Sequence, residues 1–128
     1  MSALADFLLA RIAEDEAMAV QLAQLWAKVT DADRDGLDPG VREGMDSVFA
    51  VADGAPADGA PARLLAECDA KRRIVAEHDE WERSVSTTPG DDPARRERQT
   101  HRDALGTVLR LLAVPYAGHA DYREEWRP

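Results

Sequence analysis

The first 29 residues contain neither proline nor glycine, and their apolar side chains recur every three or four positions. The stripe consists of Leu4, Leu8, Ile12, Ala19, Leu22, Trp26 and Val29. This spacing predicts a long amphipathic helix over residues 3–29, with Ser2 as its N-cap and Asp6 in or near its first turn. Such a helix is stable when its apolar side packs against other elements, so we expect a helical bundle.

A short helix is predicted over residues 39–52. Asp38 precedes Pro39, an order typical of an N-cap followed by the first helical position. The run Val48 to Val51 also suits a strand, so this alternative stays open. The following "DGAPADGAPA" repeats a pentapeptide of alanine and turn formers, which predicts a surface loop over residues 53–60.

The second half of the chain carries two more stretches with helical periodicity, separated by "STTPGDD". The predicted elements are a helix over 61–86, a loop over 86–92, a helix over 93–113 and a C-terminal tail over 114–128. We therefore predict an all-α fold in which three long helices and one short helix form a single domain, residues 1–128.

Apolar positions on the inner sides of these helices should form the core. A chain of 128 residues is long enough to bury such a core without a disulfide or a structural metal. We expect these side chains to be largely buried: Leu8, Ile12, Leu22, Trp26, Leu64, Leu65, Cys68, Val75, Leu105, Val108 and Leu112.

The net charge of -9 is concentrated in the first half of the chain. Residues 1–60 contain 12 acidic and 4 basic side chains, whereas residues 61–128 contain 13 and 12. Such a field disfavours direct binding to nucleic acid or to anionic membranes and favours basic partners, with solubility alone as the alternative role of the charge. The expected partner is a protein, with self-association as the alternative. The N-terminal residues lack the pattern of a secretory signal, and no apolar run approaches the roughly 20 residues that span a bilayer. We expect a cytoplasmic protein.

The stretch "DADRDGLDPGVRE", residues 31–43, resembles the first half of a calcium-binding loop. Such a loop supplies oxygens from positions 1, 3 and 5, turns at a glycine at position 6 and ends on a glutamate at position 12. Asp31, Asp33, Asp35 and Gly36 fit this pattern, but position 12 is Arg42. The sequence therefore predicts an acidic turn and no calcium site.

Cys68, His78, His101 and His119 are the candidates for nucleophilic or metal chemistry. Cys68 and His78 are ten residues apart on one predicted helix, or about 15 Å along its axis, so they cannot touch. His78 lies on an apolar stripe, where a hydrogen-bonded core or boundary histidine is the expected role. The chain contains no nucleophile elbow, phosphate-binding loop or zinc-protease motif. We predict no enzyme activity, no catalytic residue, no bound metal and no cofactor.

The tail carries aromatic and arginine side chains close together: Tyr116, Tyr122, Arg123, Trp126 and Arg127. One interpretation is structural, with the aromatics packed across the helix over 61–86 and Arg123 or Arg127 paired with acids there. The other is that these five residues form an exposed patch for a partner, because Trp, Tyr and Arg dominate interface hot spots. The tail is predicted to be ordered in either case.

Three segments resemble the DUF6221 family of uncharacterised small proteins from actinobacteria and their phages. They are "FLLARIAEDE" (7–16), "PARLLAECDAKRRIVAEH" (61–78) and "LRLLAVPYAGHADYREEWRP" (109–128). The resemblance implies a cytoplasmic actinobacterial or phage setting. Members often carry cysteines with metal-ligand spacing between the last two segments, which implies a zinc site, but residues 79–108 of this chain contain no cysteine.

We consider functions of three classes. The first is a non-enzymatic interaction module that binds another protein, favoured by the one-sided acidity and the aromatic tail. The second is an anti-defence or antitoxin-like inhibitor whose acidic half occupies a basic nucleic-acid-binding groove. The third is a small metal-dependent protein that uses the histidines and Cys68.

Overall fold

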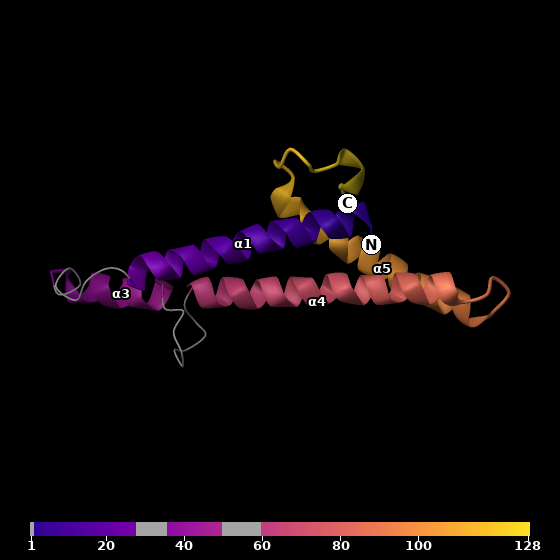
Figure 1. Ribbon diagram of the computed structural model, residues 1–128, viewed down its shortest axis with the longest axis horizontal. Coiled ribbons are helices and arrows are strands. Elements are labelled where there is room, and N and C mark those ends of the chain that lie inside the picture. The colour runs from indigo at the N-terminus through magenta and orange to yellow at the C-terminus, as the bar shows by residue number, and fades with distance from the viewer. Residues whose placement is uncertain (1, 28–35, 50–59) are drawn as a thin grey trace. The chain divides into compact units, whose positions relative to one another are not determined.

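The computed structural model describes residues 2–27, 36–49 and 60–128. These residues form four α-helices and two short 3₁₀ helices and include no strand, so the predicted all-α fold is confirmed. The elements are α1 (Ala3–Ala27), α3 (Pro39–Phe49), α4 (Ala60–Thr87), α5 (Ala94–Ala113), η1 (Val114–Tyr116) and η2 (Glu124–Trp126), as labelled or coloured in Figure 1. None of the described helices is both long and apolar enough to cross a bilayer.

The predicted capping residues start two of the helices, and Asp92 makes a comparable contact just before α5. The Ser2 hydroxyl accepts a hydrogen bond from the Ala5 amide at 3.2 Å at the start of α1. Asp38 Oδ1 accepts one from the Gly40 amide at 2.9 Å at the start of α3. Asp92 Oδ1 accepts one from Ala94 at 2.9 Å, and α5 begins at Ala94, one residue later than predicted. These side chains satisfy amides that have no partner within the helix.

The structure tests the predictions for residues 28–60 only in part. Val48 and Phe49 are helical, so the strand alternative is wrong at these positions. Residues 50 and 51 of that run, residues 31–35 of the acidic stretch and residues 53–59 of the predicted loop lie outside the described residues.

Contacts within the chain define two compact units, residues 1–12 with 70–128, and residues 13–69. The first unit combines the start of α1, most of α4, all of α5 and the tail. That the whole chain forms one domain stays a prediction.

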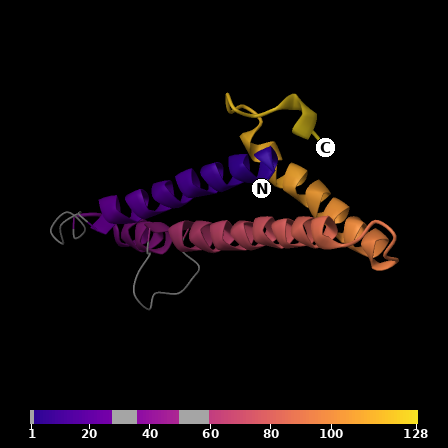
Figure 2. The same ribbon diagram turned by 45° about the vertical axis from the view of Figure 1, so that its right-hand side comes forward.

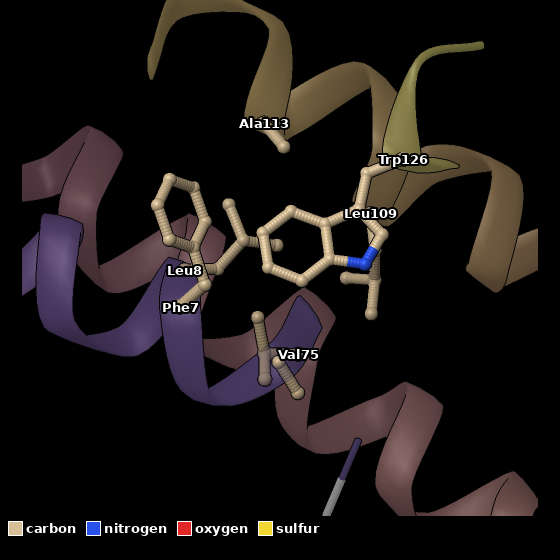
Figure 3. Close-up of a cluster of buried hydrophobic side chains, with 7 residues drawn as sticks. Phe7, Leu8, Val75, Leu109, Ala113 and Trp126 are labelled. Carbon is tan, nitrogen blue, oxygen red and sulfur yellow. The ribbon is translucent and has the colours of Figure 1, made fainter. Parts of the chain in front are cut away.

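The core of the first unit is built from all four of these segments. Figure 3 shows Phe7 and Leu8 of α1, Val75 of α4, Leu109 and Ala113 of α5, and Trp126 of η2 converging on one cluster. Leu8, Leu109 and Ala113 are completely buried. Burial of this apolar surface is the main favourable term for the unit, because each large side chain removed from water contributes about 1.5–3 kcal/mol.

The predicted core positions divide into three groups. Leu8, Ile12, Cys68 and Val75 are buried as expected. Leu64, Leu65, Leu105, Val108 and Leu112 are half-buried. The prediction for Leu22 is wrong, because its side chain is exposed, and the side chain of Trp26 lies outside the described residues.

The exposure of Leu22 has a local cause. Met18, Val20 and Leu22 are all exposed although Ala19 between them is completely buried. Apolar residues therefore surround this part of α1, and helical spacing alone does not select the buried side.

Two arginines of α5 hold the C-terminal end of α4. Arg95 Nη1 donates to the carbonyl of Val85 at 3.0 Å and also to the carbonyl of Thr88. Arg98 Nη1 donates to the hydroxyl of Thr88 at 2.7 Å, and Thr88 is buried. The last carbonyls of a helix have no partner within it, so these contacts fix both the end of α4 and the turn into α5.

We expect Arg95→Ala to lower the free energy of unfolding by about 1–3 kcal/mol, because buried carbonyls that lose charged donors are left without partners. Urea denaturation followed by circular dichroism measures this change. Arg96→Ala is the matched control, since Arg96 is an exposed neighbour on the same helical turn. Equal stability of the two variants would contradict the role assigned to Arg95.

Candidate functional site

The aromatic side chains of the tail pack against the first turns of α1. The ring of Phe7 lies 5.0 Å from that of Trp126, 6.0 Å from Tyr122 and 6.3 Å from Tyr116, measured between ring centroids. Figure 1 and Figure 2 both show the tail beside this end of α1. The tail is ordered as predicted, but its main contact is α1 and not the helix over 61–86. That helix contributes Lys71, whose Nζ lies 5.9 Å from the centre of the Tyr116 ring.

The predicted pairing of Arg123 or Arg127 with acids of the third long helix is wrong. Arg127 Nε lies 2.9 Å from Glu124 Oε1, and Arg123 Nη1 lies 3.6 Å from Glu125 Oε1. Both pairs are therefore internal to the tail. Glutamates two and three positions away are close by chain connectivity alone.

A buried arginine beside Phe7 also joins the tail to α1. Arg11 is 8% exposed, its guanidinium contacts His119 Nε2, and its Cζ lies 5.4 Å from the centre of the Phe7 ring. The amide of Asp121 donates to His119 Nδ1 at 3.1 Å. Arginine and a backbone amide can only donate, and a neutral imidazole accepts at one ring nitrogen, so one of these two contacts is a hydrogen bond in each tautomer of His119. An edge contact with Phe7 also holds the ring. These contacts fix the turn that precedes Tyr122.

A groove of about 560 Å³ lies between the tail and α1. Its floor is aromatic, because Phe7 and Trp126 are both buried and Tyr122 is half-buried. The other lining residues are alanines and charged side chains, all of them exposed except Arg11. The remaining lining residues are Ala3, Asp6, Ala10, Arg11, Ala120, Asp121 and Arg123.

Arg123 gives one side of the groove a defined geometry. Its Cζ lies 5.4 Å from the centre of the Trp126 ring, while the side chain remains 58% exposed. Asp6 and Asp121 are exposed acids of the same groove. An apolar floor with both signs of charge at its edges suits a segment that buries an apolar side chain and presents a polar or charged one.

Three of the five predicted partner-binding residues line this groove, namely Tyr122, Arg123 and Trp126. Tyr116 is half-buried against Phe7, and Arg127 is exposed beside Glu124. Sequence reasoning did not find Phe7, Arg11 or His119 as parts of this site. The only signal in the sequence was that His119 lies within the aromatic tail. Phe7 and Arg11 belong to the other end of the sequence, so no local pattern connects them with the tail.

The histidines and the cysteine of the metal-dependent alternative have different surroundings. His119 belongs to the groove region, and His101 stacks on Trp81 with ring centroids 4.5 Å apart. Cys68 is buried in the unit of residues 13–69, and His78 is buried in the other unit. The structure does not bring His78, His101 and His119 to one point.

Fold and site together define an all-helical protein whose aromatic tail is docked on its first helix. The model of a family described as a family of unknown function, DUF6221, matches residues 1–128, so the chain belongs to this family. Searches of curated proteins and of solved structures found no match.

Proposed function

We propose that this protein is a non-enzymatic interaction module that binds another protein through the groove between α1 and the tail. The observation that carries the proposal is that Tyr122, Arg123 and Trp126 line one groove together with α1. Aromatic and arginine side chains contribute most of the binding energy in protein interfaces. The proposal places the protein in the cytoplasm.

The charges of the groove favour a partner segment with a basic and an apolar side chain. Asp6 and Asp121 offer exposed carboxylates, and the aromatic floor accepts an apolar group. The chain as a whole carries a net charge of -9, which attracts basic partners over long range. Because Phe7, Trp126 and Arg11 are already held in place, binding would cost little ordering of side chains.

The alternative of an acidic inhibitor rests on the charge of residues 1–60, and part of that segment lies outside the described residues. No described contact favours it over the groove. The metal-dependent alternative is independent of the groove.

The substitution Ala10→Arg tests the proposal, because Ala10 is an exposed residue of the groove wall and arginine is a good helix former. We expect it to block the groove and abolish capture of the partner without changing the melting temperature. The partner is first isolated with the tagged full-length chain from an actinobacterial lysate, and its affinity is then measured by calorimetry.

Ala104→Arg is the matched control, because Ala104 is an exposed alanine of α5 that lies outside the groove. It should bind the partner as the unsubstituted chain does. Equal binding by Ala10→Arg would exclude the groove, and recovery of this chain alone would replace the proposal by self-association.

A further inference from the structure

His78 is a buried histidine whose Nδ1 atom lacks a hydrogen-bond partner among the described residues. Its side chain is 9% exposed and lies in the second half of α4. Asp79 follows it, and its Oδ1 atom is also buried without a hydrogen-bond partner in the described part of the chain. The two atoms are 3.9 Å apart, which is too far for a direct hydrogen bond.

Two neighbouring buried atoms of this kind require an explanation. The great majority of buried polar side-chain atoms in proteins have a partner, and a buried atom without one lowers stability. One donor group or one cation placed between His78 and Asp79 would satisfy both atoms.

Glu82 completes a set of three ligand groups. It is four residues after His78 and therefore lies on the same side of the helix. The imidazole nitrogen of His78 and carboxylate oxygens of Asp79 and Glu82 all lie within 4.8 Å of one another. No other group of this kind occurs among the residues that the structure describes.

We propose that His78, Asp79 and Glu82 form a binding site for one divalent transition-metal ion, with zinc as the ion that fits best. One imidazole and two carboxylates form a set of nitrogen and oxygen donors that zinc accepts at about 2.0–2.2 Å. Ligand atoms at those distances in a tetrahedral shell are roughly 3.4 Å apart, so small rotations of the three side chains close the site around an ion. The inference does not depend on the groove or on its partner.

The surroundings leave room for further ligands. His78 and Glu82 line a pocket of about 710 Å³, which α5 and the tail also border. A Cβ atom added at Gly106 of α5 would lie 3.7 Å from His78 Nε2, so this side of the imidazole faces α5. Nδ1 then remains for the ion, and water from the pocket fills the open coordination position.

The full-length chain is freed of metal with a chelator and titrated with zinc against a chromophoric competitor. We expect one zinc ion per chain. Replacing zinc by cobalt(II) gives visible absorption bands whose intensity reports tetrahedral coordination by the protein.

Glu82→Gln and Asp79→Asn keep the size of each side chain and remove its charge. We expect either change to lower zinc affinity by at least about 100-fold, because loss of an outer-shell partner alone lowers metal affinity about 10–100-fold. Circular dichroism melting without metal shows that the variants are folded.

Two controls separate this site from surface binding. Glu80→Gln changes an exposed acid of the same helix that pairs with Arg83, and His101→Ala removes an exposed histidine. Both should bind zinc as the unsubstituted chain does. Absence of zinc binding at micromolar concentration, or equal binding by Glu82→Gln, would overturn the proposal.

Discussion

Replacing Trp126 by alanine is expected to lower the free energy of unfolding by about 3–5 kcal/mol, as for other buried tryptophans. For a chain of this size that corresponds to a fall of roughly 10–20 °C in the melting temperature. The reason is that Trp126 is 7% exposed and packs on Phe7 in the core of its unit, although only two residues follow it in the sequence. Thermal melting followed by circular dichroism measures the effect.

Arg127→Ala controls for changes in the tail that leave the core intact, because Arg127 is exposed and pairs only within the tail. Its melting temperature should change little. Deletion of Asp121 to Pro128 should resemble Trp126→Ala. If both the deletion and Trp126→Ala left stability unchanged while a partner was lost, the tail would serve recognition alone.

Replacing Leu109 by alanine is expected to lower the free energy of unfolding by about 2–5 kcal/mol. Leu109 is completely buried in the cluster formed by α1, α4, α5 and the tail. The cavity left by the smaller side chain cannot be filled without moving segments from four parts of the chain, so the upper part of this range applies. Urea denaturation provides the measurement.

The same helix supplies two graded controls. Leu111 is 54% exposed, so Leu111→Ala should be nearly neutral, and Leu112 is half-buried against the cluster, so its replacement should have an intermediate effect. A loss at Leu111 as large as that at Leu109 would show that the buried side of α5 is assigned wrongly.

The helices were predictable because their signals are local. Ser2 and Asp38 precede the helices that they cap, and each makes the expected side-chain contact with a backbone amide. A cap and an apolar stripe depend only on residues within a few positions, which a single sequence contains in full.

The partners of the tail were not predictable in the same way. The aromatic residues indicated correctly that the tail is docked, but nothing in their spacing distinguishes α1 from α4 as the surface they cover. The two arginines were assigned long-range acids, whereas Glu124 and Glu125 were available locally. An exposed ion pair contributes little to stability. The path of the tail therefore determines which ion pairs form, and the ion pairs do not determine the path.

The candidate metal ligands show a third kind of limit. The sequence placed His78 on an apolar stripe and indicated a hydrogen-bonded core or boundary histidine. The burial of His78 is confirmed, whereas its Nδ1 atom has no hydrogen-bond partner among the described residues. Its neighbours Asp79 and Glu82 did not stand out, because acids are frequent in this chain. Only the packing of α4 shows that Nδ1 of His78 and Oδ1 of Asp79 are buried together.

The contact between Arg11 and His119 joins residues 108 positions apart, and it has a consequence for how the protein is made. At translation rates of about 5–20 residues per second, the start of α1 waits on the order of 5–20 s for the tail to be synthesised. During that interval Phe7 and Leu8 lack the partners that bury them in the finished core. The core of this unit therefore closes only after Trp126 has been synthesised, and a chain cut off before Trp126 would carry an exposed apolar surface that chaperones or proteases recognise.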